Sequence, residues 1–504
     1  MQPRGQGSEG MAQEHAKVVI VGGGFSGIAM AIRLKQEGIE DFVVLERADD
    51  VGGVWHYNSY PGCMCDVPSH LYSLSFAPNP NWSHTYSPQS EIRDYLRSCA
   101  DEFGIRPHLR TGVAVEAATW REDDARWQVD TTAGTFTARV VVSGMGPLTE
   151  PKLPAVPGLA RFYGKTLHSA RWDHDFDLKG KRVASIGTGA SAIQYVPEIQ
   201  PEVEQLHVFQ RTAPWIMPHG DRPISDVERE LYRRVPLVQR LVRAGVYAGR
   251  ELLVLGFAKE PRLMGLLEKL ARAHRNKQIS DPELREKVTP DYTLGCKRML
   301  PSNRWYRALG KPNVELVTGG LSEVRERSVV DANGVEREVD AIIFGTGFQV
   351  TETPYAYQLR GRGRQLMSDL WQGSPRAYMG TSVPGFPNLF LLLGPNTGLG
   401  HSSMIYMIES QVEHVLRAIK AVGGEEATTI EIRAEALAEY NSDVDEQMRG
   451  TVWDTGGCSS FYIDNTGRNA TLWPDWTWRF RQRAVRFDSG AYTVTGDTKV
   501  PVAA

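Results

Sequence analysis

Two glycine-rich turns carry residue types that bind phosphate. Gly22, Gly24 and Gly27 form a GxGxxG pattern between an apolar run and an amphipathic run, and Glu46 ends the next apolar run. Such glycines permit a tight turn and let backbone N–H groups approach a pyrophosphate. A carboxylate about twenty residues further along the chain accepts hydrogen bonds from a ribose. A glycine-rich hairpin turn is the alternative, but the flanking runs and the placed acid favour a dinucleotide.

The second turn differs in the residue that follows its second strand. Gly187, Gly189 and Ala192 form GxGxxA, and the strand beyond them leads to Arg211 and Thr212 rather than to an acid. A carboxylate there would repel a 2′-phosphate, whereas a guanidinium donates two parallel hydrogen bonds to it. We therefore predict NADP at this turn and FAD at the first, with a surface arginine lacking a ligand as the alternative for Arg211. Two dinucleotides in one chain indicate hydride transfer from NADPH to a flavin.

Each turn lies inside a strand–turn–helix–strand unit. These units span 17–47 and 181–212, and strand-like runs at 115–146 and 336–347 are expected to return to them. A leucine- and arginine-rich stretch with helical spacing lies between the second unit and the last of these runs. The predicted fold class is therefore α/β, with two Rossmann-like dinucleotide-binding domains for FAD and NADP and a helical insertion in the NADP domain.

The predicted domain boundaries follow from this order. The FAD-binding domain takes 1–149 and, with a mobile loop and a C-terminal tail, 381–504; the NADP-binding domain takes 150–216 and 296–380, around the insertion at 217–295. We expect the insertion to wall the substrate cavity and to keep its charged side in solvent. A basic amphipathic face that lies on a membrane is the alternative.

Composition narrows the class of protein. The chain has 504 residues and a formal net charge of -3, which gives no overall attraction to nucleic acid or anionic lipid. The polar start, 1–16, lacks the apolar run of a signal peptide, and no stretch reaches the ~18 apolar residues of a membrane span. We expect this start and the tail after about residue 490 to be loose, as chain ends usually are. We predict a cytoplasmic enzyme, monomer or homodimer, without a nucleic-acid partner or an integral membrane segment.

The number and spacing of the cysteines bear on disulfide formation and on metal binding. Their number is five, an odd count, and none form a CxxC pair, which favours reduced thiols over a disulfide framework. Cys63 and Cys65 with His70 have a spacing seen in metal sites but lack a fourth ligand. We interpret these two cysteines as buried thiols and predict no metal.

A stretch just before the second unit carries a family resemblance. In FYGKTLHSARWD, residues 162–173, five positions match the fingerprint FxGxxxHxxxW[PD] of the Baeyer–Villiger monooxygenases: Phe162, Gly164, His168, Trp172 and Asp173. The chain resembles this family over nearly its whole length, including GGVW (52–55), YPGCMCD (60–66), CKR (296–298) and GPNTG (394–398). Flavin-containing N- and S-oxygenases have Tyr or Phe where Trp172 stands, so the Trp–Asp ending separates the two classes.

The resemblance implies an NADPH-dependent FAD monooxygenase that uses O₂ to convert ketones to esters or lactones. The implied reaction passes through a C4a-peroxyflavin and a tetrahedral (Criegee) intermediate, with sulfoxidation as a side activity. Arg298 would stabilise the negative charge of the flavin peroxide and of the tetrahedral intermediate, and Lys297 would add to its positive field. Asp66 would position Arg298. The resemblance therefore implies that Arg298 and Asp66 are catalytic and also bind the cofactors. Trp55 and Asn396 are further implied cofactor-binding residues. A surface charge and a turn-stabilising carboxylate are the alternatives for Arg298 and Asp66.

Two further segments take their roles from the resemblance. The fingerprint would be a hinge between the domains in which His168 switches hydrogen bonds, and a packed linker with a satisfied core histidine is the alternative. The stretch GGCSSFYIDNTGRN, 456–469, resembles a mobile loop that folds over NADP and substrate. Phe461 precedes Tyr462 where the family commonly has Trp, so the indole N–H donor is missing although stacking can persist.

Three other functions compete with this interpretation. A flavin-containing N- or S-oxygenase acting on amines or sulfides is disfavoured by Trp172–Asp173 and by the Asp66/Arg298 pair. A flavin-dependent disulfide reductase shares the two-nucleotide plan, but it needs a CxxC, and this chain has CMC at 63–65. A non-catalytic NADP(H)-sensing protein would lack yellow colour and would not oxidise NADPH.

Overall fold

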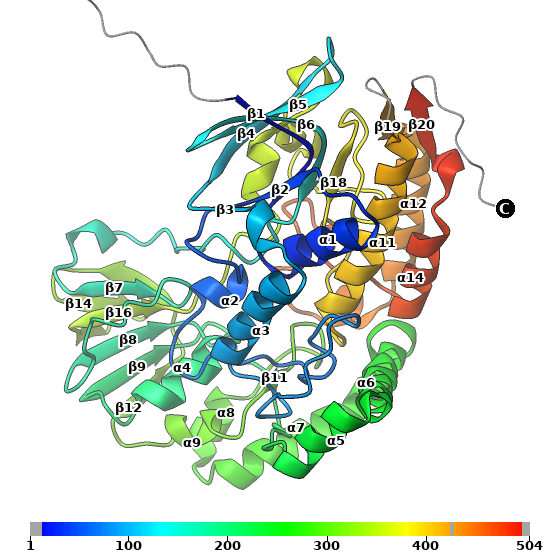
Figure 1. Cartoon of the computed structure of the whole chain (residues 1–504). Coiled ribbons are helices and arrows are strands. Elements are labelled where there is room, and N and C mark those ends of the chain that lie inside the picture. The colour runs from blue at the N-terminus through cyan, green and yellow to red at the C-terminus, as the bar shows by residue number, and fades with distance from the viewer. Residues whose placement is uncertain (1–12, 424–427, 496–504) are drawn as a thin grey trace, which may run out of the picture.

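Two sheets, each assembled from distant parts of the chain, organise the structure (Figure 1). The computed structural model describes residues 13–423 and 428–495. The first predicted unit forms β1 (Gln13–Val21), α1 (Phe25–Gln36) and β2 (Phe42–Glu46), and the second forms β8 (Arg182–Ile186), α4 (Ala192–Ile199) and β9 (Gln205–Phe209). The predicted α/β class with two dinucleotide-binding units is confirmed.

The first sheet has eight strands in the order β17-β4-β5-β6-β1-β2-β3, with β18 also paired to β6. Its centre is parallel, since β1 pairs in parallel with β2 and β6, whereas β4, β5 and β6 are antiparallel. Layers on both faces of the parallel part explain why the valines and isoleucine of β1 are fully buried. The remaining bounds are β3 Leu109–Thr111, β4 Val115–Arg121, β5 Arg126–Thr131, β6 Gly134–Ser143, β17 Leu359–Arg360 and β18 Leu389–Leu391.

The second sheet has five parallel strands in the order β12-β9-β8-β16-β7. Its outer strands are β7 (Lys165–His168), which contains part of the fingerprint, and β12 (Val314–Val317), while β16 (Ala341–Phe344) lies inside. A small antiparallel sheet follows β12 and is formed by β13 (Leu321–Val324), β14 (Ser328–Asp331) and β15 (Glu336–Glu338).

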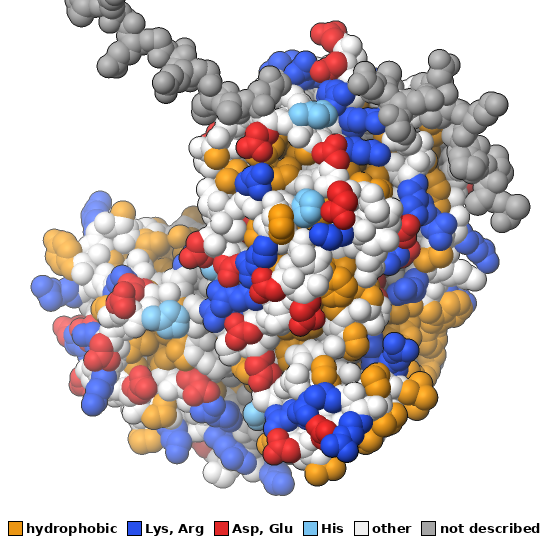
Figure 2. Space-filling model, in the orientation of Figure 1, with side chains coloured by type: hydrophobic (Ala, Val, Ile, Leu, Met, Phe, Trp, Pro, Cys, Tyr) orange, Lys and Arg blue, Asp and Glu red, His pale blue; other side chains and the backbone are white. Residues whose placement is uncertain are grey.

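The helical insertion forms an arm along one side of the molecule (Figure 1). Its helices are α5 Asp226–Arg234, α6 Pro236–Glu251, α7 Met264–Gln278 and α8 Pro282–Lys287. Contrary to expectation, the outer side of α6 is largely apolar: Leu237, Leu241 and Leu252 just beyond it expose 61%, 63% and 61% of their surface, and Figure 2 shows hydrophobic side chains gathered there. Gln239 and Glu251 of α6 are buried, and Arg243 and Arg250 are partly buried, so most of its polar side chains point inward.

Further helices pack on the first sheet or connect the two parts. Helix α11 packs against α1 and α14. Their bounds, with the other helices and short strands, are α2 Val54–Tyr57, α3 Gln89–Glu102, α9 Trp305–Leu309, α10 Met367–Trp371, α11 Met404–Val422, α12 Ala434–Met448, α13 Val452–Thr455, α14 Thr477–Arg486, β10 Ile216–Met217, β11 Leu300–Pro301, β19 Thr429–Ile432 and β20 Tyr492–Thr495.

Parts of the two segments predicted to be loose form strands. Residues 13–16, expected to be loose, extend β1 along β6, and β20, beyond residue 490, pairs with β19. The rest of the predicted loose ends, 1–12 and 496–504, lies outside the described residues. Within the described ranges, no helix has the length and apolar character to cross a bilayer.

Candidate active site

Asp66 and Arg298, 232 positions apart in the chain, form a two-pronged ion pair. Arg298 Nε donates to Asp66 Oδ2 at 2.5 Å and Nη2 donates to Oδ1 at 2.5 Å. The third guanidinium nitrogen, Nη1, donates to the carbonyl of Leu399 at 3.4 Å. The pair is partly buried, with side-chain exposures of 30% for the arginine and 21% for the aspartate. A planar fork on a carboxylate fixes the orientation of the guanidinium as well as its position.

Both groups of this pair keep their charge. Burial alone would raise the pKa of Asp66, but the charge and hydrogen bonds of Arg298 outweigh it and hold that pKa below its usual range. Burial alone would lower the pKa of Arg298, but Asp66 raises it. The structure therefore provides a fixed cation that cannot act as a proton donor at neutral pH.

A second arginine, missed in the sequence, reaches Asp66 from the insertion. Arg250, near the end of α6, donates to the backbone carbonyl of Asp66 at 3.3 Å and to the hydroxyl of Tyr86 at 3.5 Å. Two turns earlier, Arg243 donates to the carbonyl of Ser73 at 2.8 Å. The inner side of α6 therefore holds the segment that carries Asp66. No sequence pattern marks these residues, because the contacts join segments about 180 residues apart.

The segment that precedes Asp66 is also held by α4, the helix of the second predicted unit. Gln194 of α4 accepts a hydrogen bond from the Tyr60 hydroxyl at 2.8 Å and donates to the carbonyl of Met64 at 3.0 Å. Asp66 thus lies in a segment that α4 of the second predicted nucleotide unit and α6 of the insertion hold together.

A buried carboxylate ties the insertion to two more segments. Glu251, at the end of α6, accepts from the Thr477 hydroxyl at 2.7 Å, from the Thr477 backbone N–H at 3.0 Å, and contacts His401 Nε2 at 3.3 Å. His401 belongs to the same loop as Leu399, and Thr477 begins α14. The loop that accepts a hydrogen bond from Arg298 through Leu399 is therefore linked through His401 and Glu251 to the ends of α6 and α14.

The first glycine turn has the shape that a dinucleotide requires. A Cβ added at Gly27 would lie 1.8 Å from the carbonyl oxygen of Gly22, and one added at Gly53 would lie 2.8 Å from Gly24 Cα. The GxGxxG turn and the GGVW stretch are therefore packed backbone against backbone at the start of α1. The first N–H groups of a helix have no partner inside it, so this end is suited to a pyrophosphate.

Glu46 and Trp55 lie next to this turn. Glu46, 4% exposed at the end of β2, accepts hydrogen bonds from the backbone N–H groups of Gly23 at 2.6 Å and Ala48 at 2.8 Å. Each carboxylate oxygen keeps a second lone pair for a ribose hydroxyl. Trp55, in α2, donates to the hydroxyl of Tyr72 at 3.1 Å. These residues fit FAD.

The second glycine turn is more open. Gly187 has φ of +107°, and a Cβ at Gly189 would meet nothing within 4 Å, which leaves room for a ligand above the start of α4. Ala192 is the first residue of α4 and is fully buried. Thr212 accepts a hydrogen bond from the Thr188 hydroxyl through its carbonyl, at 3.3 Å, so its own hydroxyl is not used there.

Arg211 has a basic neighbour from another part of the chain. Burial, followed by the nearby positive charge of Arg211, lowers the pKa of Lys297. Two neighbouring cations fit an anion such as a 2′-phosphate, and Asp291 acts on the pKa of Lys297 in the opposite direction. The ammonium of Lys297 lies 4.8 Å from the centre of the Tyr292 ring.

Asn396 has no side-chain atom left over. Its Nδ2 donates to the carbonyls of Asn469 at 2.8 Å and Leu472 at 3.0 Å, and its Oδ1 accepts from Arg468 at 2.7 Å. Its role is thus to fasten the GPNTG turn to the end of the 456–469 segment. One lone pair of Oδ1 is left for a ligand.

The two aromatic residues of the 456–469 segment have different environments. Tyr462 is 3% exposed, and burial raises its pKa to about 12, with opposing influences from the charges of Arg298 and Asp66. Phe461 is 51% exposed. The tyrosine is therefore the aromatic residue that lies at the ion pair, and the phenylalanine lies at the surface.

The expectation of five reduced cysteines is wrong. Cys296 and Cys458 form a disulfide with their Cα atoms 6.1 Å apart, and Cys63, Cys65 and Cys99 are free and buried. Counting and local spacing could not reveal a pair separated by 162 residues. The bond links the CKR stretch to the 456–469 segment.

The fingerprint packs against the second sheet. His168 ends β7 opposite Phe344 of β16, and it is 7% exposed with its pKa lowered to about 4, chiefly by burial. Trp172 packs on Tyr195 with ring centres 5.6 Å apart, and Asp173 accepts from Lys165 at 2.5 Å. These contacts fit a packed linker, and a hinge role stays a prediction.

Replacing Gly164 with alanine is expected to destabilise the protein. A Cβ there would lie 2.4 Å from the Asp340 carbonyl oxygen and 2.5 Å from Cζ of Phe162, so backbone must move. Overpacking of this kind costs about 1–3 kcal/mol, and thermal unfolding should show a lower Tm. Gly220→Ala is the matched control, since its Cβ would meet nothing within 4 Å. Equal Tm values for the two variants would contradict the tight packing of the fingerprint.

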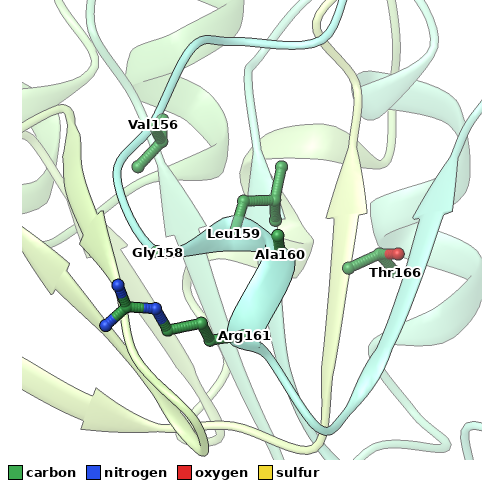
Figure 3. Close-up of a pocket in the computed structure, with 6 residues that line it drawn as sticks. All are labelled: Val156, Gly158, Leu159, Ala160, Arg161 and Thr166. Atoms are coloured by element: carbon green, nitrogen blue, oxygen red, sulfur yellow. The ribbon is translucent and has the colours of Figure 1, made fainter.

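One surface hollow lies away from these residues. It has a volume of about 670 Å³ and lies beside the fingerprint's start, lined by Val156, Gly158, Leu159, Ala160, Arg161 and Thr166 (Figure 3). Its lining includes no residue of the ion pair or of either glycine turn.

Comparisons with known proteins agree with this geometry. Residues 15–225 match the family described as Flavin-binding monooxygenase-like. A Baeyer–Villiger monooxygenase of Streptomyces coelicolor is 52% identical over 95% of this chain and 93% of its own length, and one of Pseudomonas aeruginosa is 50% identical over 96% and 92%. Among solved structures, a closed cyclohexanone monooxygenase superposes with a TM-score of 0.84, at 28% identity over 96% of this chain and 100% of its own. A steroid monooxygenase bound to NADP gives a TM-score of 0.83, at 30% identity over 95% and 99%.

Proposed function

Because the chain belongs to the Baeyer–Villiger monooxygenases, which use FAD and NADPH, we propose that Arg298 and Asp66 are its catalytic pair and that its substrates are ketones. The observation that carries this is the two-pronged ion pair, whose carboxylate lies in a segment held by α4 and α6. When bound, FAD supplies the activation of O₂ and NADPH supplies two electrons.

Arg298 has a defined task in this proposal. Negative charge develops when a ketone carbonyl receives oxygen, and a pre-oriented guanidinium stabilises that charge without reorganising. Asp66 keeps the guanidinium in place by accepting two of its N–H groups, and Arg250 holds the Asp66 backbone. Nη1, whose hydrogen bond to Leu399 is long at 3.4 Å, is the nitrogen free to face the reacting atoms.

The remaining site residues bind the cofactors. Gly22, Gly24, Gly27, Glu46 and Trp55 hold FAD, and Arg211, Thr212 and Lys297 hold the 2′-phosphate of NADP above Gly187, Gly189 and Ala192. Tyr462 excludes water on the side of the ion pair that faces the 456–469 segment, since its ring is buried there. The fingerprint acts as the hinge, and the insertion walls the ketone cavity through the inner side of α6.

We propose domain limits that follow the sheets. The FAD-binding domain takes 1–149 and the C-terminal part, the NADP-binding domain takes 150–216 and the part after 296, and the insertion takes 217–295. The return to the FAD-binding domain lies before residue 359 rather than at 381, because β17 pairs with β4 of the first sheet. The enzyme is proposed to be cytoplasmic, where NADPH is supplied, and a monomer or homodimer.

Product analysis tests the proposed function. We expect the purified protein to be yellow and to convert some members of a panel of cyclic, linear and aryl ketones into esters or lactones 16 mass units heavier. Ester should form in step with NADPH consumed, and ¹⁸O₂ should place one heavy atom in the product. Oxygenated amines or sulfides with every ketone untouched would instead assign the protein to heteroatom oxidation.

A further inference from the structure

Three successive side chains of the CKR stretch engage three different regions. Cys296 is bonded to Cys458, Lys297 lies near Arg211, and Arg298 holds Asp66. The disulfide is therefore two residues from the proposed catalytic arginine and next to a proposed 2′-phosphate ligand. Any movement of Cys296 is passed directly to both cations.

On the other side of the bond lies a weakly held stretch, 457–463. Its described hydrogen bonds stay local, from Tyr462 N–H to Ser460 Oγ at 3.3 Å and from Ile463 N–H to the Ser460 carbonyl at 3.3 Å. The preceding residue, Gly456, accepts from Thr293 N–H at 3.0 Å. The disulfide and the buried ring of Tyr462 connect 457–463 to the residues around Arg298, and a single β-bridge from Ile463 to Asn469 closes the end of this stretch.

We propose that Cys296 and Cys458 are positioning residues, whose disulfide holds the 457–463 stretch, with Tyr462, over the Arg298–Asp66 pair. Reduction to two thiols releases this stretch, while Arg468 and Asn469 stay fastened, so that NADPH binding and oxygen transfer depend on the thiol–disulfide state of the enzyme. This inference rests on the proposed roles of Arg298 and of the 456–469 segment.

The reductive step needs a partner of defined chemistry, a dithiol. One thiolate of the dithiol attacks Cys458, the more accessible sulfur, and Cys296 leaves as a thiolate that takes up a proton. The second thiol of the reductant then displaces Cys458, which also leaves as a thiol. Two electrons and two protons pass to the protein, and the reductant becomes a cyclic disulfide. A disulfide oxidant such as glutathione disulfide reverses the exchange.

Release of the segment should weaken the binding of NADPH more than it slows turnover. If the free segment covers the site for about one tenth of the time, the apparent affinity falls about tenfold. We expect Cys458→Ser to raise the KM for NADPH about tenfold with kcat changed less than about twofold, and to release more hydrogen peroxide per NADPH. The Kd of NADP⁺, measured without turnover, should rise by the same factor as the KM.

Covalent state and segment mobility are measured directly on the whole FAD-loaded protein. Peptide mapping without reductant should recover one cross-linked peptide pair containing Cys296 and Cys458. Chymotrypsin should cut after Phe461, which is already exposed, several times faster in Cys458→Ser than in the wild type. Wild-type protein treated with a phosphine reductant and desalted should match the variant in KM, Kd and cleavage rate, and glutathione disulfide should restore it.

Treatment of Cys458→Ser with the same phosphine reductant is the control. This variant keeps the free thiols of Cys63, Cys65 and Cys99 but lacks the disulfide. No change is expected there. Free thiols at both positions in oxidised wild-type protein, or identical KM, Kd and cleavage rates with and without the bond, would overturn the inference. Those results would leave ketone oxygenation intact, whereas failure of the proposed function would show as a lack of ester product in the oxidised wild type.

Discussion

Arg298→Ala should lose ester formation while it still oxidises NADPH. Hydride transfer uses the NADP residues around Arg211, which the substitution leaves in place, but the charge that develops on the ketone oxygen loses its cation. Removal of one pre-oriented donor costs about 10²–10³ in rate, and removal of a whole guanidinium should cost at least that. Ester, NADPH and hydrogen peroxide are measured in one sample, and the electrons should appear as peroxide.

Two substitutions separate charge from geometry. Arg298→Lys keeps a cation but cannot place two parallel N–H groups on Asp66, so it should recover only part of the ester yield. Arg240→Ala is the matched control, since this arginine is exposed on the outer side of α6 and should behave as wild type. A normal ester yield from Arg298→Ala would remove this residue from the chemistry.

Arg211→Ala should raise the KM for NADPH by about tenfold to a hundredfold, which is the loss of a hydrogen-bonded charge contact of about 1.5–3 kcal/mol. NADH lacks the 2′-phosphate, so its KM should stay nearly unchanged. The ratio of kcat/KM values for the two nucleotides is the measurement.

Lys297→Ala tests the partner that the structure adds to this site. It should shift the same ratio in the same direction, and the double variant should lose less than the product of the single effects, because both side chains face one anion. An equal loss with NADPH and NADH in either variant would contradict the 2′-phosphate assignment.

The local parts of this architecture could be predicted from the sequence. Glycine spacing, apolar runs and the position of Glu46 identify β1, α1 and β2 because these signals lie within about thirty residues, the size of one such unit. The same holds for β8, α4 and β9. The full eight-stranded sheet was harder to predict from the sequence, because β17 joins it through only two residues, Leu359 and Arg360.

Contacts between distant segments could not be predicted. Arg250 and Glu251 look like ordinary charges of an amphipathic helix, yet they face inward because Asp66 and Thr477 supply their partners. The Cys296–Cys458 bond depends on the folded path of 162 residues. Lys297 was associated with its sequence neighbour Arg298, but the chain bends at Cys296 and Lys297, and the ammonium lies over the Tyr292 ring.

A crystal structure of the FAD- and NADP⁺-loaded protein tests the central claim most directly. The account predicts that the Arg298 guanidinium, still paired with Asp66, lies in contact with the flavin ring on the face that a ketone can reach. A flavin ring remote from both side chains, with the arginine turned toward solvent, would contradict it.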